Sequence, residues 1–159
     1  MQTLTGFENL AGSDFDDLLV GSDGDNEFRP VAGKDTIDGG GGYDTVRYSS
    51  TGFVFNTVAQ VGVTVDLQSG TGTDNWGFAD SFTNIEAAIG TNLGDDLTGK
   101  VIGNGLLSIL RGLAGNDTIR GIDADTAFLI TADYREDPGA VRVNLSGAAE
   151  TLGGLLIAA

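Results

Sequence analysis

The chain contains no cysteine and no histidine, and only two of its 159 residues are proline. Without cysteine it has neither a disulfide framework nor a thiolate metal site, which leaves its redox compartment open. Without histidine it has no imidazole base, no Ser-His-Asp triad and no usual zinc site. These absences, together with the lack of a distinct catalytic segment, predict that the chain is not an enzyme.

Basic residues are also scarce: 8 lysines and arginines stand against 23 aspartates and glutamates, which gives a net charge of −15. So acidic a chain repels nucleic acid and anionic membranes, and its natural partners are cations. Of the acidic residues 18 are aspartate and only 5 are glutamate, beside 26 glycines. Because aspartate and glycine favour turns whereas glutamate favours helix surfaces, this composition predicts many acidic loops and few helices.

The two ends of the sequence show neither a cleaved signal peptide nor a membrane span, although the apolar C-terminus is compatible with a type I secretion signal. The first 14 residues lack the basic and apolar stretches of a cleaved signal peptide. The apolar ending LGGLLIAA is far too short to span a bilayer, so no membrane span is expected.

Residues 12–47 repeat with a period of nine: GSDFDDLLV, GSDGDNEFR, PVAGKDTID and GGGGYDTVR. Each unit has a turn-forming residue first, a carboxylate or amide sixth, and a large apolar residue eighth. The sixth residues are Asp17, Asn26, Asp35 and Asp44. The eighth residues, which we assign to the core, are Leu19, Phe28, Ile37 and Val46. A period of nine suits a short loop followed by a short strand, stacked as a solenoid.

The same plan returns in a less regular form in the second half of the chain. GTNLGDDLT and GLAGNDTIR place Asp95 and Asp117 in the sixth position. The unit between them, GNGLLSILR, has Ser108 in the sixth position, and serine is a poor metal ligand. In the last unit, GIDADTAFL, the sixth residue is Thr126 in one register and Asp125 in another, and both registers stay open.

A half-buried strand is predicted after each array, at residues 62–67 and 141–145, because apolar and polar residues alternate there. The chain therefore consists of two copies of one module. The first module covers residues 1–84, with a cap at 1–11, the array at 12–47, and a link and strand at 48–84. The second covers residues 85–159, with a degraded array at 90–128 and a strand and C-terminal segment at 129–159.

Two nine-residue units complete one turn of such a solenoid, so loops two units apart stack on the same side. Asp17 then lies above Asp35, and Asn26 lies above Asp44. Stacked carboxylates repel each other by several kcal/mol at intermediate dielectric unless a cation sits between them. The loop glycines permit positive φ angles and let carbonyl oxygens converge on one point. Mixed carbonyl and carboxylate cages suit Ca²⁺ better than Mg²⁺, so we expect several calcium ions.

GGGGYDTVR matches the nonapeptide G-G-x-G-x-D-x-U-x, and GLAGNDTIR, GTNLGDDLT and GSDFDDLLV are close variants of it. Through these units, at residues 12–47 and 90–120, the chain resembles the RTX (repeats-in-toxin) family of calcium-binding proteins. The resemblance implies an all-β fold, a right-handed parallel β-roll with calcium ions between successive loops. It also implies a secreted bacterial protein, exported by a type I system through an uncleaved C-terminal signal and folded outside the cell on meeting calcium.

The predicted calcium ligands combine side chains and backbone carbonyls of the loops. The side chains are the sixth-position residues Asp17, Asn26, Asp35, Asp44, Asp95 and Asp117. The carbonyls are those near Gly12, Gly21, Gly24, Gly33, Gly39, Gly40, Gly42, Gly112 and Gly115. Four further aspartates either add second ligands or raise the negative potential that attracts calcium: Asp14, Asp16, Asp23 and Asp25.

Some loops depart from the repeat, and in these loops the resemblance implies fewer calcium ligands. Residues 30–32, Pro-Val-Ala, replace the glycines that open the third loop, so calcium binding is expected to be weakest there. Asn26 supplies an oxygen but no charge. Asp117 either lacks a partner two loops away or pairs with Asp95 if the out-of-register residues between them loop out.

The expected function is that of a non-catalytic calcium-binding module at the cell surface or outside the cell, either free or attached to a larger polypeptide. One alternative is a calcium-dependent adhesive or self-assembling surface or biofilm protein, because a solenoid has open ends. Another is the non-catalytic part of a secreted enzyme such as a protease, lipase or alginate epimerase. Trp76 either stacks on a sugar or packs against the protein.

Overall fold

A computed structural model describes residues 6–49, 61–102, 108–121, 130–137, 150–152 and 155–157. All regular structure in these residues is β-strand, which confirms the predicted all-β class, and none of them forms a helix able to cross a membrane. The strands are β1 (Asn9–Ala11), β2 (Leu18–Val20), β3 (Glu27–Arg29), β4 (Thr36–Asp38), β5 (Thr45–Arg47), β6 (Thr64–Asp66), β7 (Thr71–Thr73), β8 (Ala79–Thr83), β9 (Ala87–Ile89), β10 (Asp96–Thr98), β11 (Ser108–Arg111), β12 (Thr118–Arg120), β13 (Ile130–Ala132), β14 (Glu150–Leu152) and β15 (Leu155–Ile157).

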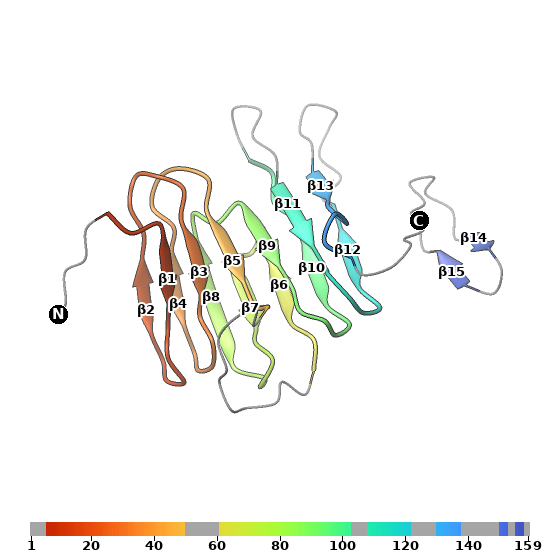
Figure 1. Cartoon of the computed structure of the whole chain (residues 1–159), viewed down its shortest axis with the longest axis horizontal. Coiled ribbons are helices and arrows are strands. Elements are labelled where there is room, and N and C mark those ends of the chain that lie inside the picture. The colour runs from red at the N-terminus through yellow and green to blue at the C-terminus, as the bar shows by residue number, and fades with distance from the viewer. Residues whose placement is uncertain are drawn as a thin grey trace.

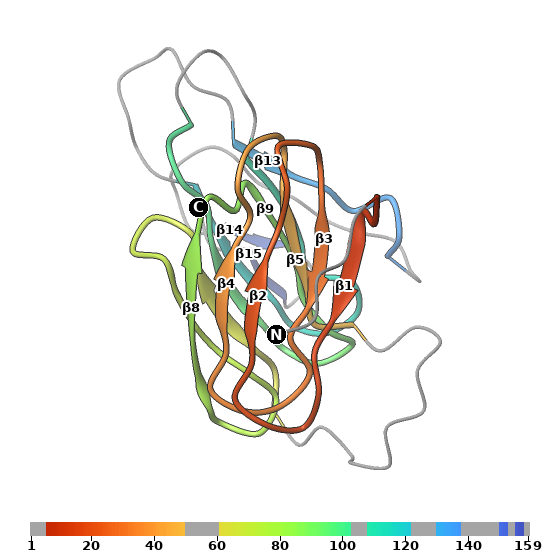
Figure 2. The ribbon, with the colours of Figure 1, turned by 90° about the vertical axis from the view of Figure 1, so that its left-hand side faces the viewer.

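Each nine-residue unit of the first array forms a loop from its first six residues and a strand from its last three. Glycine and aspartate, which dominate the first six positions, are poor strand formers, whereas the apolar eighth residue and its neighbours favour an extended chain. Successive strands alternate between two facing sheets, which we call sheet A and sheet B (Figures 1 and 2). Sheet A has the order β1-β3-β5-β9-β11-β13, and sheet B has the order β12-β10-β6-β7-β8-β4-β2.

Neighbouring strands of the first array come from every second unit and run parallel. Phe28 pairs with Val46 in sheet A, and Leu19 pairs with Ile37 in sheet B. In both cases the partners are 18 residues apart, which is the spacing that the stacking of two nine-residue units predicts. The loops that precede β2 and β4 therefore lie at one side of the stack, and those that precede β3 and β5 lie at the other.

The two arrays are joined within the same pair of sheets. In sheet B a meander separates them: β7 runs antiparallel to β6 and β8, while β8 pairs in parallel with β4 and β6 pairs in parallel with β10. In sheet A, β5 pairs directly with β9. The predicted module boundary at residues 84 and 85 lies between β8 and β9, so strands from both sides of it share both sheets (Figure 1).

The hydrophobic core lies between sheets A and B. The predicted core residues Phe28, Ile37 and Val46 are each fully buried, which confirms the assignment of the eighth position. Leu19 is only partly buried because β2 is an edge strand with a neighbour on one side. Further core residues come from the meander and the second array, among them Val65, Phe82, Leu97 and Leu110.

Four further sequence predictions concern where strands, the cap, Trp76 and the last repeat lie in the chain. The strand predicted at residues 62–67 is present as β6, and β1 forms within the predicted cap. Trp76 lies half-buried in the turn between β7 and β8. The strand predicted at 141–145 and the alternative registers of Thr126 and Asp125 lie outside the described residues.

Candidate cation site

The six sixth-position residues lie in three stacked pairs of loops. In each pair the backbone N–H of the sixth residue of one loop donates to a carboxylate oxygen of the sixth residue of the other. The hydrogen bonds run from Asp17 N to Asp35 Oδ1 (2.9 Å), from Asn26 N to Asp44 Oδ1 (2.8 Å) and from Asp95 N to Asp117 Oδ1 (3.0 Å). The structure thus brings the predicted ligands together two by two. Of the two alternatives left open for Asp117, it shows the one in which this residue pairs with Asp95, because β10 and β12 are parallel neighbours.

The carboxylates of Asp35 and Asp44 are 0% exposed, and Oδ2 of each has no hydrogen-bond partner among the described residues. An ionised oxygen buried in this way is costly, so each group favours either a proton or a cation. Burial raises the pKa of Asp35 to about 7, against the lowering effect of the Asp17 N–H and with the charge of Asp80 adding to the rise. Burial likewise raises the pKa of Asp44 to about 6, against the lowering effect of the Asn26 N–H.

In the second array, the stacked pair of sixth-position residues is Asp95 and Asp117. Asp95 is buried, but both of its oxygens accept hydrogen bonds, Oδ2 from Thr91 N (2.6 Å) and Oδ1 from Val63 N (2.8 Å). Burial raises the pKa of Asp95, and these N–H groups oppose the rise. For Asp117 burial raises the pKa to about 6, opposed by the Asp95 N–H. Asp117 therefore shares the raised pKa of Asp35 and Asp44, but it is only half-buried.

Two carboxylates that sequence reasoning missed continue the stack beyond the first array. Asp80 Oδ1 accepts the N–H of Asp35 (2.9 Å), and Glu86 Oε2 accepts the N–H of Asp44 (2.9 Å). Each occupies the place of a sixth-position residue in the next layer. Their signal in the sequence is a carboxylate two residues before an apolar residue, in DSF and EAA, but they do not lie nine residues after a preceding unit. The period therefore did not reveal them.

Asp80 also belongs to a buried polar group where the meander meets the first array. The Tyr48 hydroxyl donates to Asp80 Oδ2 (2.5 Å), and burial raises the pKa of Tyr48, which keeps the phenol protonated. Asp74 is fully buried: its Oδ1 accepts the N–H groups of Trp76 (2.9 Å) and Phe78 (2.8 Å), while its Oδ2 has no partner among the described residues. Burial raises the pKa of Asp80 to about 6, opposed by the Tyr48 hydroxyl and reinforced by the charge of Asp74. Negative charge therefore accumulates at this junction.

Glu86 differs from Asp35 because a basic side chain reaches it. Lys100 Nζ lies 2.7 Å from Glu86 Oε1 in a largely shielded ion pair. In the part of the chain that the structure describes, no lysine or arginine forms an ion pair with Asp35. Among the described residues, the stack thus contains a tethered cation beside Glu86 and none beside Asp35.

The described residues contain no cluster of three or more acidic side chains able to hold a metal, so an ion held here would need backbone carbonyls or water molecules as further ligands. The stacked loops bring carbonyl and carboxylate oxygens to one place. A Cβ built on Gly12 would lie 2.5 Å from Pro30 O and 2.7 Å from Asp17 Oδ2. One built on Gly39 would lie 2.5 Å from Asp44 Oδ2. A donor set of few carboxylates with several carbonyls fits Ca²⁺, which tolerates loose geometry, better than Mg²⁺.

The predicted carbonyl-bearing glycines occupy three kinds of position. Those with positive φ are Gly33, Gly40, Gly42 and Gly115. Those that open a loop, where a Cβ would collide with backbone or side-chain oxygens, are Gly12, Gly21, Gly39 and Gly112. Gly24 shows neither feature, since its φ is not positive and the nearest atom to a built Cβ is 3.8 Å away. It therefore has the weakest structural reason to be glycine.

Without calcium, the stability of the protein is expected to fall as the pH rises from about 4 to about 7. Asp35, Asp44, Asp80 and Asp117 have folded-state pKa values of about 7, 6, 6 and 6 against an ordinary value of 3.8. Between these limits the folded protein binds more protons than the unfolded chain, so rising pH favours unfolding. A single shift from the ordinary value to about 7 lowers Tm on the order of 10 °C for a chain of this size.

Thermal melts followed by circular dichroism in chelator, at a series of pH values, measure this dependence. In excess calcium the pH dependence of Tm should weaken or reverse, because calcium ions compete with protons for the buried carboxylates. A Tm in chelator that rises over the same interval would contradict the expectation.

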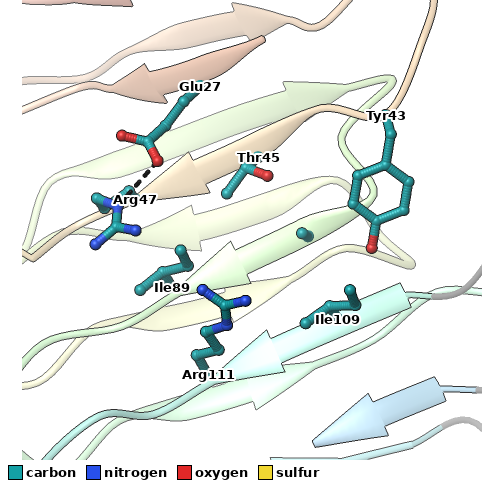
Figure 3. Close-up of a pocket in the computed structure, with 8 residues that line it drawn as sticks. Glu27, Tyr43, Thr45, Arg47, Ile89, Ile109 and Arg111 are labelled. Atoms are coloured by element: carbon teal, nitrogen blue, oxygen red, sulfur yellow. Dashed lines mark hydrogen bonds and ion pairs between the residues drawn. The ribbon is translucent and has the colours of Figure 1, made fainter. Parts of the chain in front are cut away.

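A shallow groove of about 160 Å³ lies on the outer face of sheet A (Figure 3). Its lining residues are Glu27, Tyr43, Thr45, Arg47, Ala87, Ile89, Ile109 and Arg111. Both arginines are paired with carboxylates, Arg47 with Glu27 at 3.1 Å and Arg111 with Asp133 at 2.7 Å. The groove is smaller than the roughly 300–1,000 Å³ of pockets that enclose a small molecule, and none of the predicted calcium ligands lines it.

The chain matches no protein-family model, and a search of curated proteins gives no match. Its function is therefore inferred from the chemistry of the stacked loops.

Proposed function

We propose that this chain is a calcium-binding β-roll of the RTX kind, a right-handed parallel β-solenoid whose stacked loops hold the ions. The observation that carries the proposal is the presence of two fully buried carboxylate oxygens, Asp35 Oδ2 and Asp44 Oδ2, without a hydrogen-bond partner among the described residues. The alternation of strands between two sheets, with parallel partners 18 residues apart, supports the roll. The nonapeptide resemblance supports calcium as the ion.

The residues of the chain have distinct tasks in this mechanism. Asp35 and Asp44 supply charged oxygens, and the N–H groups of Asp17 and Asn26 fix the orientation of both carboxylates. Loop carbonyls beside the first-position glycines complete the oxygen cage. A bound calcium ion supplies the positive charge that the buried carboxylates lack.

Calcium binding is then linked to folding. Because the ions bind the folded form only, stability rises with the logarithm of the free calcium concentration. At the submicromolar calcium of a bacterial cell the acidic chain stays expanded and exportable, and at the millimolar calcium outside it folds and becomes rigid. The proposed location is accordingly extracellular or at the cell surface, and the proposed role is calcium-triggered structural support.

Titration of the metal-free chain with calcium tests the proposal. At neutral pH and physiological temperature, far-UV circular dichroism in chelator should show a weak strand signal, and added calcium should produce the full signal and move the cooperative melt to well above that temperature. Isothermal titration calorimetry should show several bound ions, and magnesium at the same concentration should not replace them. A strand signal already complete in chelator, with no heat of calcium binding, would contradict the proposal.

A further inference from the structure

The six loops fall into two kinds that differ at their second residue. In the first kind, which we call closed loops, this residue is serine or threonine, and its backbone N–H donates to the sixth side chain of the same loop. The bonds run from Ser13 N to Asp17 Oδ2 (2.6 Å), from Ser22 N to Asn26 Oδ1 (2.7 Å) and from Thr91 N to Asp95 Oδ2 (2.6 Å).

The hydroxyl of the second residue completes each closed loop. It lies within hydrogen-bond distance of the sixth side chain, at 3.0 Å for Ser13 and 2.9 Å for Thr91. It also accepts the N–H of the fourth residue, which is Phe15 in one loop (3.3 Å) and Leu93 in another (3.0 Å). Such short-range hydroxyl bonds are a known alternative to regular backbone pairing. The oxygen that would face an ion is thus already filled by donors of its own loop.

In the second kind, which we call open loops, the second residue has a positive φ instead. These residues are Val31 (φ 80°), Gly40 (φ 90°) and Leu113 (φ 68°). No donor of the same loop reaches the sixth carboxylate in the described structure, and Oδ2 of Asp35 and of Asp44 is left bare. For valine, which is β-branched, a positive φ is a true outlier, and such strain tends to be retained at functional sites.

The second residue, rather than the fourth, separates the two kinds of loop. Gly33 and Gly42, the fourth residues of two open loops, have φ of 112° and 108°. The closed loop at residues 21–26 also has glycine fourth, yet Gly24 does not have a positive φ, and its N–H donates to Ser22 Oγ (3.2 Å). Glycine at the fourth position therefore does not open a loop when serine stands second.

We propose that the second residue of each loop decides whether that loop binds a calcium ion. The bare oxygen of an open loop takes the ion, whereas an ion in a closed loop would have to displace the N–H and the hydroxyl of the second residue. Because each stacked pair contains one closed and one open loop, each pair holds one ion. The ions lie at Asp35, Asp44 and Asp117, and none lies at Asp17, Asn26 or Asp95. This assignment rests on the proposed calcium-binding function.

The assignment also changes the expectation for the loop opened by Pro30. That loop lacks the first two glycines of the repeat, but the φ of Val31 (80°) is close to that of Gly40 (90°), and the φ of Gly33 (112°) is close to that of Gly42 (108°). It is therefore a full binding site rather than the weakest one.

Calorimetric titration of the whole chain with calcium chloride tests the inference through the number of ions bound. The variants Val31→Ser and Gly40→Ser should each close one loop and each lower the count from three to two, and together they should lower it to one. Gly41→Ser is the matched control. It places the same side chain one position further on, where φ is not positive and a built Cβ makes only ordinary contacts from 3.4 Å. It should keep the wild-type count.

A variant of the opposite kind gives a readout that does not depend on adding a side chain. Thr91→Gly should open the Asp95 loop and raise the count by one, with the strand signal in calcium confirming the fold. If Val31→Ser and Gly40→Ser bind as many ions as the wild type, while Asp35→Asn and Asp44→Asn lose them, the inference is overturned and the calcium function stands. If the wild type binds no calcium, both the proposed function and this inference are wrong.

Discussion

Replacing Asp35 and Asp44 together by asparagine is expected to remove most of the stabilisation that the protein gains from calcium. The amide has the shape of the carboxylate but no charge, so burying it without an ion costs much less. Asn26 shows that a buried amide fits the sixth position of a stacked loop, where it accepts the Ser22 N–H at 2.7 Å. In chelator at neutral pH the double variant should melt above the wild type, since the wild-type carboxylates lose stability by ionising.

The size of the effect follows from linkage. An ion that binds only the folded form adds about 2.7 kcal/mol when its concentration is about 100 times its Kd. Two such ions add about 5 kcal/mol, which corresponds to roughly 10–20 °C in Tm for a chain of this length. The double variant should show only the smaller gain due to the Asp117 loop.

Thermal melts in chelator and in excess calcium measure both quantities. The control is the Asp14→Asn/Asp23→Asn variant, which removes the same charge from two exposed third-position carboxylates of the closed loops. It should retain nearly all of the calcium response, because solvent screens the attraction that these exposed carboxylates exert on the ions. A double variant of Asp35 and Asp44 that gains as much from calcium as the wild type would show that these oxygens hold no ion.

The repeating part of the fold could be predicted because one short period fixes both strand and core. A three-residue strand turns one side chain inward, so the eighth position alone places Phe28, Ile37 and Val46 in the core, where the structure has them. The same rule is less accurate for Leu19, which points inward but lies in an edge strand and is only partly buried. Burial at the end of a stack depends on the neighbouring layer and not on residue type.

The meander could not be predicted from the period because its place depends on long-range pairing. Thr36 of β4 pairs with Ser81 of β8 across 45 residues, and this pairing is what brings Asp80 onto Asp35. A repeat search follows constant spacing, and no constant spacing connects these residues.

The candidate site was predictable in its residue types but not in its hydrogen bonds. The period makes Asp17 and Asp35 equivalent, whereas in the described residues Asp17 accepts an N–H from its own loop and Asp35 does not. The difference lies in the second residues, Ser13 and Val31, which are visible in the sequence. Their effect on the carboxylate becomes evident only once the backbone angles are known.

Replacing Phe28 by alanine is expected to cost about 3–5 kcal/mol of unfolding free energy, which is the range for a buried phenylalanine that leaves a cavity. Phe28 is 0% exposed, and its ring reaches the loop of the preceding residues: a Cβ built on Gly21 would lie 2.9 Å from Phe28 Cζ. Phe15 is the matched control, since it lies in the same array and is 78% exposed. Its replacement by alanine should change stability by no more than about 0.5 kcal/mol. Urea denaturation in excess calcium compares the two, and equal losses would contradict the assignment of the eighth position to the core.

The same substitution should move the calcium concentration at which the chain folds, because core and ions stabilise one cooperative state. If three ions bind on folding, a loss of about 3–5 kcal/mol raises the midpoint of a calcium-induced folding curve by roughly 5- to 17-fold. Phe15→Ala should leave the midpoint unchanged. Circular dichroism during a calcium titration measures the shift. A Phe28→Ala variant that loses stability in urea yet folds at the wild-type calcium concentration would show that ion binding and core packing are separate events, and would rule out calcium as the trigger of folding.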